Sequence, residues 1–379
     1  MVESRRHGDD RLRLTRLARG LSQGDLARTA GVTRQAISGI ESGRWSPSLD
    51  VALSLASALD STVEALFGTA PEAPPVRARL AVAPTDPPAE GPERLTVAEV
   101  AGDVVAFPLT GDHTMLAGFV PALATGPIGG EDGDDRGRRP GGGRGREIEA
   151  RRIAATTPTL AVAGCDPALA LLLGPLQRHD PPVNLAWWST SNGTATELLD
   201  SGAVHAAAIH RSVEGRTRPR PGIEVVGFAS WREGLAVHPR HRGAVRDLSD
   251  LVRLGLRIAN REQGAEARRL LDAELSRLKI DPAQLAGYGS VASGHLLAAS
   301  GVAAGMVDAA VVCEPAALAY GLEFIAWQQE LSELHIPRSL ASSTEVRALL
   351  DVLAGRELPA QLGALDGYDP EPCGRILAA

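Results

Sequence analysis

The sequence has few cysteines, no CxxC pair and no long apolar run. Cys165, Cys313 and Cys373 are its only cysteines, and their spacing argues against a zinc module or a disulfide framework. The longest apolar run, residues 296–307, is too short to span a bilayer. The charged start of the chain also lacks the apolar core of a secretory signal. We therefore expect a cytoplasmic protein that makes no membrane contact.

Positive charge is not in excess either. The 39 basic residues, of which only Lys279 is lysine, face 46 acidic ones, and the net charge of −7 excludes a wholly basic coat for nucleic acid. It does not exclude one basic module. The length of 379 residues indicates two or three domains, and 44% hydrophobic residues are enough to form their cores.

Composition divides the chain into segments. Seven prolines lie in residues 69–94, although residues 76–82 alternate like a short strand, and nine glycines lie in residues 126–146. Two apolar runs around Ala101-Gly102-Asp103 indicate a hairpin. The predicted segments are a helical domain (9–68), a Pro-rich linker (69–94), a small β segment (95–124), a Gly-rich disordered loop (125–150) and an α/β domain (155–379).

Residues 11–68 carry the signals of short helices joined by a tight turn. Ser22 and Asp25 are spaced as a capping box, and Thr33 can cap the next helix. Gly31 lies where the chain must turn, four residues after the small Ala27. This spacing is typical of a helix-turn-helix.

The stretch LSQGDLARTAGVTRQAISGIESGRWSPSLDVALSLASAL resembles the XRE family of phage-repressor and Cro-like DNA-binding domains. The resemblance covers about 58 residues and implies an all-α five-helix domain whose second motif helix enters the major groove. Arginine and glutamine at its start suit guanine and adenine respectively. The predicted base-facing residues are Thr33, Arg34, Gln35 and Ser38. The resemblance assigns Gln23 and Arg44 to the DNA backbone.

Local charge supports phosphate contact, because residues 1–45 hold nine arginines and five acidic residues. The alternative is a small helical interaction module whose polar face is merely solvated.

In the C-terminal part, short apolar strands alternate with amphipathic helices, and small polar or glycine residues follow one strand after another. The carboxyl ends of parallel strands and the amino ends of helices meet at one sheet edge, which favours an anion site there. His205 and His210 lie around the third strand and are more typical of structural histidines than of ligand contacts.

Residues 160–338 resemble the type II periplasmic-binding-protein fold, and more narrowly the molybdate-binding-protein-like domains fused to helix-turn-helix regulators. The matching pieces include VAGCDPALALL, RIANREQGAEARRLLDAEL and CEPAALAYGLEFIAW. The resemblance implies a two-lobed α/β domain that closes on a ligand. The family's N-R-x-x-G-S-G-T-R loop has lost its Ser and Thr here and gained Glu266, which puts binding of a bare oxyanion in doubt.

The predicted ligand-binding residues come from both lobes. Lobe one contributes Cys165, Asp166, Ser189, Thr190, Ser191 and Asn192. Lobe two contributes Asn260, Arg261, Gly264 and Arg268, and Arg232 and Glu314 lie at the rim. Asp166 can equally serve only as a helix cap. We predict no catalytic residue, metal site or cofactor, because no nucleophile–base pair, metal cluster or phosphate loop is evident in the sequence.

Together these features predict a DNA-binding transcriptional regulator, not an enzyme. Its C-terminal domain would sense molybdate, a molybdenum-cofactor species or an organic acid. One motif per chain implies a homodimer on a pseudo-palindromic double-stranded operator. Two alternatives stay open: a protein related to molybdopterin-metabolism enzymes, or a DNA-binding protein whose C-terminal domain has lost its ligand and only dimerises.

Overall fold

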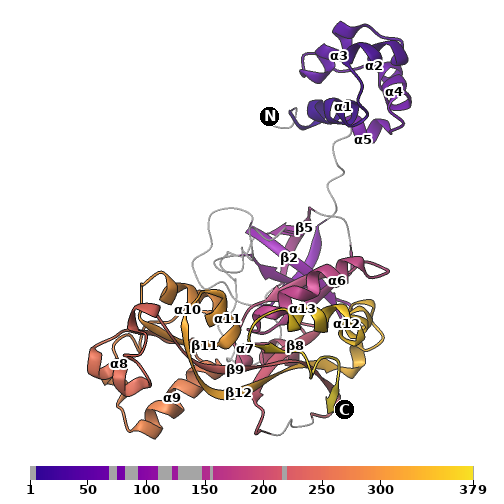
Figure 1. Cartoon of the computed structure of the whole chain (residues 1–379). Coiled ribbons are helices and arrows are strands. Elements are labelled where there is room, and N and C mark those ends of the chain that lie inside the picture. The colour runs from indigo at the N-terminus through magenta and orange to yellow at the C-terminus, as the bar shows by residue number, and fades with distance from the viewer. Residues whose placement is uncertain are drawn as a thin grey trace, which may run out of the picture. The chain divides into compact units, whose positions relative to one another are not determined.

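The structure, a computed structural model, comprises two compact units, residues 1–74 and 75–379 (Figure 1). It describes residues 6–67, 75–81, 93–109, 122–126, 147–153, 157–215 and 220–378.

The first unit is all-α, as predicted. Its helices bury a small core that includes Leu12, Leu26, Ile37 and Leu55. The five helices are α1 (Arg6–Ala18), α2 (Gln23–Ala30), α3 (Arg34–Glu41), α4 (Leu49–Ala58) and α5 (Val63–Phe67).

The predicted caps of the helix-turn-helix are confirmed. Ser22 and Asp25 form a capping box at the start of α2. Gly31 ends α2 with a φ of +67°, a left-handed conformation that favours glycine. The Thr33 hydroxyl then accepts the Ala36 amide at the start of α3.

One buried ion pair ties these helices together. Nε of Arg16 on α1 donates to Oε1 of Glu41 at the end of α3, at 2.6 Å, and a second guanidinium nitrogen donates to Oε2 at 3.1 Å. The side-chain amide of Gln23 donates to the same carboxylate at 2.8 Å. Helices α1, α2 and α3 therefore meet at Glu41.

The second unit starts with a closed five-stranded barrel in the order β1-β3-β2-β4-β5. The predicted hairpin is confirmed: β2 and β3 pair antiparallel, Val100 opposite Asp103, around Ala101-Gly102. The strands are β1 (Val76–Leu80), β2 (Glu93–Val100), β3 (Asp103–Pro108), β4 (Ala124–Gly126) and β5 (Glu147–Arg152).

Barrel strands β2 and β3 are apolar on both faces because both faces are covered. Val97 and Ala106 point into the barrel core, whereas Val105 and Phe107 belong to the core of the α/β domain. The Phe107 ring lies 5.6 Å from that of Trp188. The barrel thus packs against the α/β domain.

Strand β1 confirms the alternation noted at residues 76–82, within the predicted linker. The barrel corrects the predicted disordered loop at both ends, because the last two residues of β4 and the first four of β5 lie inside it. Strand β1 pairs with both β5 and β3 in the barrel. These short strands are therefore stabilised by partners that lie far away in the sequence. The rest of the Gly-rich stretch, 127–146, lies outside the described residues.

The α/β domain is built on one nine-stranded sheet, in the order β10-β11-β9-β12-β8-β6-β7, with β13 and β14 paired to β9. Its strands are β6 (Thr159–Ala163), β7 (Asn184–Trp188), β8 (Ala206–Ser212), β9 (Ile223–Val237), β10 (Ile258–Ala259), β11 (Ala309–Cys313), β12 (Glu323–Pro337), β13 (Tyr368–Asp369) and β14 (Ile376–Ala378).

One hydrophobic cluster in one half of the domain and two in the other define the predicted lobes, here called the first and second halves. The helices of the two halves lie toward opposite ends of the sheet (Figure 1). The first half carries α6 (Leu173–Arg178), α7 (Asn192–Asp200), α12 (Thr344–Ala354) and α13 (Glu357–Gly363). The second carries α8 (Leu248–Leu254), α9 (Glu266–Leu278), α10 (Gly294–Ala303) and α11 (Glu314–Ala319). Among the described residues, no helix is long and apolar enough to cross a membrane.

The halves share two 15-residue strands, β9 and β12, which pair antiparallel along their whole length. Apolar runs at residues 224–228 and 235–237 predict two short strands, but β9 runs continuously through both. The pairing leaves no space at Gly234, where a Cβ would lie 2.1 Å from the Ile325 carbonyl oxygen. The backbones of β9 and β12 therefore join the halves directly.

Replacing Glu41 by glutamine should lower the free energy of unfolding of the first unit by about 3 kcal/mol, because Arg16 would keep a buried charge without a counter-charge. Denaturation of the full chain, followed by circular dichroism, measures this loss. The matched control is D50N, which changes an exposed carboxylate and should cost under about 1 kcal/mol. An E41Q chain as stable as the parent would contradict the role of the pair.

The same pair predicts a pH dependence. Burial opposes ionisation of Glu41, but the hydrogen bonds from Arg16 and Gln23 outweigh it and lower its pKa below the ordinary 4.5. Its stabilisation is thus present above pH 4.5 and is lost as the pH falls through the folded-state pKa. The stability difference between parent and E41Q should shrink over that acidic range.

Candidate functional site

The predicted DNA-reading face is open at the start of α3. The side chains of Arg34 and Gln35 are exposed there, and Thr33 is the cap residue of the same helix. Ser38 lies one turn further along and is half-buried. Arginine and glutamine at the exposed start of a helix can contact base edges in the major groove.

The two residues predicted to contact the DNA backbone differ in their surroundings. Arg44 is exposed, and its Nε donates to the Ser42 hydroxyl at 3.0 Å. Gln23 is half-buried and one N–H of its side-chain amide donates to Glu41, which leaves its second N–H and its carbonyl oxygen for another contact. Gln23 therefore also helps to hold α2 against α3.

In the C-terminal domain, the structure brings together the predicted loops of both halves. The loop after β7 ends at Ser191, α7 begins with Asn192 and Gly193, and the loop before α9 includes Gly264. The Gly193 amide donates to the Gly264 carbonyl at 3.4 Å, and a Cβ on Gly264 would lie 3.1 Å from Oγ of Ser191. A Cβ on Gly294, at the start of α10, would lie 3.6 Å from Oγ of Ser189.

The predicted ligand arginines are already engaged. Arg261 is almost fully buried, and its guanidinium contacts the Glu262 carboxylate at 2.9 and 3.0 Å. Arg268 donates to the Arg261 carbonyl at 3.0 Å and lies over the Tyr288 ring. Arg232 pairs with Glu314, its Nε at 2.7 Å from Oε2.

Several other predicted residues hold the site in place. Asp166 caps the helix that follows β6, as predicted, and accepts the Tyr368 hydroxyl at 2.7 Å. Ser191 caps α7. The side chains of Asn192 and Asn260 bond backbone groups of His210 and Tyr288, respectively. Thr190 is half-buried in the loop after β7.

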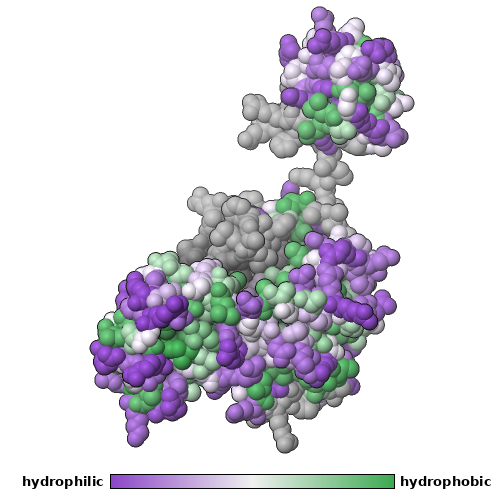
Figure 2. All heavy atoms as spheres, viewed as in Figure 1, coloured by the Kyte–Doolittle hydropathy of each residue, from purple (hydrophilic) through white to green (hydrophobic). Residues whose placement is uncertain are grey.

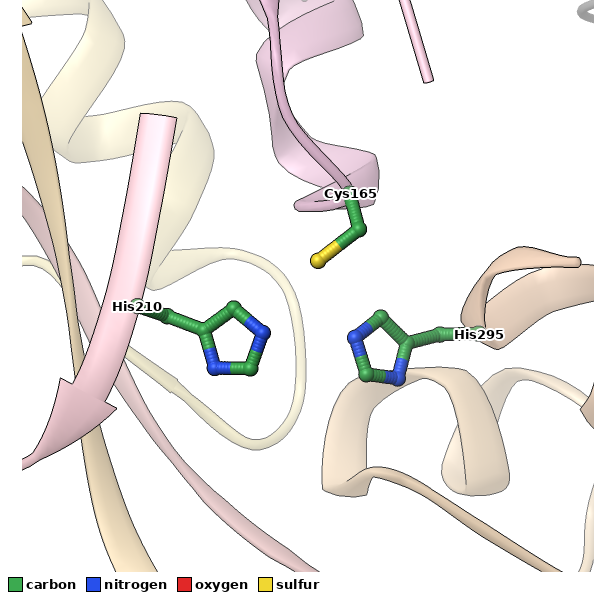
Figure 3. A group of neighbouring side chains, drawn as sticks. All are labelled: Cys165, His210 and His295. Atoms are coloured by element: carbon green, nitrogen blue, oxygen red, sulfur yellow. The ribbon is translucent and has the colours of Figure 1, made fainter. Parts of the chain in front are cut away.

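A buried cluster that the sequence does not predict lies at the meeting point of the halves. Cys165 follows β6, His210 lies on β8 and His295 lies on α10, and their side chains point toward one another (Figure 3). Their potential ligand atoms all lie within 4.8 Å of one another. The three residues are 3%, 3% and 1% exposed.

Buried carboxylates surround this cluster. Oε2 of Glu330 on β12 lies 3.0 Å from Nδ1 of His210. On β9, Glu233 lies 4.0 Å from the same nitrogen and 3.8 Å from Nδ1 of His295. Burial raises the pKa of Glu233 to about 7, with the charge of Glu330 adding to it and that of His210 opposing it.

The pKa values of the two histidines shift in opposite directions. Burial lowers the pKa of His210, but the charge of Cys165, hydrogen bonds with Cys165 and Glu330, and the charge of Glu233 outweigh this and raise it well above 6.5. Burial and the charges of Arg261 and His210 lower the pKa of His295 well below 6.5.

Little in the sequence marks this cluster. His210 is visible on an apolar strand, but its partners are 45 positions before it and 85 after it, with no ligand spacing. His205 keeps the structural role expected of it, because its Nδ1 accepts the Ala161 amide at 3.0 Å.

Replacing Gly264 by alanine tests the contact between the loops. A matched control exists in G243A, because Gly243 has a similar positive φ (+74° against +83°) but open space around it. Both variants should lose stability through backbone strain. G264A should lose about 1 kcal/mol more in urea denaturation, because its methyl group meets Ser191. Equal losses would contradict the contact.

Comparison with known proteins locates two conserved domain types. Residues 12–66 match the helix-turn-helix family, and residues 173–354 match the PBP superfamily domain. A restriction-modification controller protein from Aeromonas hydrophila, C.AhdI, is similar to the chain at 39% identity, covering 18% of this chain and all of that one with a TM-score of 0.17.

Two relatives extend these matches. The protein YvgK of Bacillus subtilis (strain 168) is 31% identical over 146 residues, 38% of this chain, which spans about half (47%) of that relative. A Clostridium pasteurianum protein, encoded in the 5′ region of a 2Fe-2S ferredoxin gene, is 33% identical over 109 residues, which are 28% of this chain and 96% of that protein. The chain therefore belongs to the family of this Clostridium protein, and it joins an N-terminal helix-turn-helix domain to a C-terminal PBP-like domain.

Proposed function

We propose that the protein is a transcriptional regulator whose affinity for DNA depends on a small ligand held in its C-terminal domain. The observation that carries this proposal is the pairing, in one chain, of two different parts. One is a helix-turn-helix with exposed polar residues at the start of α3; the other is a PBP-like domain whose predicted ligand loops converge.

A ligand changes DNA affinity only if it binds two states of the protein differently. The two halves provide such states, because the loop contacts between Gly193 and Gly264 can form or break while β9 and β12 keep the halves joined. We propose that ligand binding shifts this equilibrium.

We further propose that the regulator binds a pseudo-palindromic operator as a homodimer, since one motif reads only one half-site. Apolar side chains in the helical unit support this, because Trp45, Leu49 and Leu53 are each more than half exposed. Figure 2 shows an apolar area on this unit among hydrophilic side chains.

The charged residues around the site limit which ligand can bind there. Molybdate, a molybdenum-cofactor species and an organic acid all need free cationic or N–H groups. Arg261 is already neutralised by Glu262, and Glu233 and Glu330 add buried carboxylates. Glu266, which replaces a family glycine, pairs with Arg269 instead of entering the site. Among the predicted ligands, a bare oxyanion fits these charges least well.

The test is selection of duplex DNA from a random pool by the full chain, followed by fluorescence anisotropy on the selected sequence. Enrichment of a two-half-site sequence is the expected result. Absence of enrichment, with non-specific affinity only, would contradict the regulator proposal.

On the selected operator, R34A should cost about 1–3 kcal/mol and relax the preference at one base pair per half-site. R44A should weaken binding to all sequences alike and flatten the salt dependence. The charge-matched control is R277A, at an exposed arginine of α9. Unchanged base preference in R34A would show that α3 is oriented differently on DNA.

A further inference from the structure

We propose that Cys165, His210 and His295 form a binding site for a thiophilic metal ion of the Zn²⁺ or Cu⁺ class, shared between the two halves of the PBP-like domain. The inference deepens the proposed function by naming a ligand class, and it rests on that function only for an effect on DNA. The metal site itself stands on the geometry of the cluster.

Each of the three side chains has a ligand atom free to face the common centre. Nδ1 of His210 is engaged with Glu330 at 3.0 Å, which leaves its Nε2 for the centre. Nδ1 of His295 accepts the Cys313 amide at 3.1 Å, and its buried Nε2 has no hydrogen-bond partner among the described residues. The Cys165 side chain points between the two rings (Figure 3).

The separations fit a small ion. If the three ligand atoms are at most 4.8 Å apart, a point between them lies within about 2.8 Å of each. Bonds from zinc to sulfur and to histidine nitrogen are about 2.3 and 2.0–2.1 Å. Shifts of under about 1 Å per side chain therefore close the site.

The surrounding charges favour a cation. Glu262 already neutralises the buried Arg261. The negative charges of a Cys165 thiolate and of the Glu233 and Glu330 carboxylates are therefore left to balance a divalent ion. Glu330 on Nδ1 of His210 gives the carboxylate–histidine arrangement that orients metal ligands.

Binding requires one rearrangement at His295. An ion on Nε2 moves the ring proton to Nδ1, where Oε1 of Glu233 lies 3.8 Å away. That buried oxygen has no other partner among the described residues, so it can accept this proton. Nη1 of Arg261, 3.2 Å from Nδ1, and the Cys313 amide then both lose their present acceptor, a cost that the metal bonds must exceed.

The donor set selects the metal. One sulfur and two imidazole nitrogens suit Zn²⁺ and Cu⁺, whereas Mg²⁺ and Ca²⁺ need oxygen ligands. Three protein ligands also leave a fourth position of a tetrahedral ion for water or another small molecule. Because Cys165 and His210 belong to the first half and His295 to the second, a bound ion would tie the halves together.

The test uses the full chain after chelation, dialysed against Zn²⁺, against Cu⁺ under reducing conditions, and against Mg²⁺. Elemental analysis should find one Zn²⁺ or Cu⁺ per chain and no Mg²⁺. C165A, H210Q and H295Q should each bind at least about tenfold more weakly. The controls C373A and H179Q, at a half-buried cysteine and a histidine on the surface of the first half, should bind like the parent.

A second measurement does not depend on the variants folding. Co²⁺ bound to the parent chain should give a thiolate-to-cobalt charge-transfer band that Zn²⁺ abolishes. No band and no retained Zn²⁺ or Cu⁺ would overturn the metal site, and so would full binding by C165A and H295Q. Neither measurement contains DNA, so operator selection by a chain that binds no metal would leave the regulator proposal standing.

Discussion

The antiparallel pairing of β9 with β12 is the constraint on which the C-terminal domain depends. Fifteen residues of each strand run through both halves, so one backbone ladder fixes where the loops of either half end. The loop after β7, the loop before α9 and the start of α10 converge because of it. Residues as distant in sequence as Cys165 and His295 thereby lie close enough to bind one ion.

The paired strands β9 and β12 also place charged side chains in the interior of the domain. Glu233 lies on β9 and Glu330 on β12, both with no measurable exposure, and His210 faces them from β8. Buried carboxylates are costly unless positive charge compensates them. Arg261 is paired with Glu262 and does not fully compensate the other carboxylates. The remaining positive charge comes from His210 and, in our proposal, from a metal ion. An interior of this kind differs from the anion site that the order of strands and helices predicts.

Local signals predicted much of the fold, but the site was only partly predictable. The helix ends at Ser22, Gly31 and Thr33 can be predicted because each cap depends only on backbone groups a few residues away. The alternation at residues 76–82 indicates strand β1 but not its partners β3 and β5, and the continuity of β9 depends on pairing with β12, which lies far away in the sequence. Arg261 is visible as an arginine, but its pairing with Glu262 is not, and the Cys165–His210–His295 cluster exists only after the halves meet.

In our proposal, a metal ion bound between the halves controls DNA binding by α3. The most direct measurement is the dissociation constant of the full chain for its selected operator, with chelator and with saturating Zn²⁺. We expect Zn²⁺ to change the dissociation constant of the parent chain by at least about fivefold and to leave that of H295Q unchanged. An equal dissociation constant in both conditions, with Zn²⁺ shown to be bound, would contradict it.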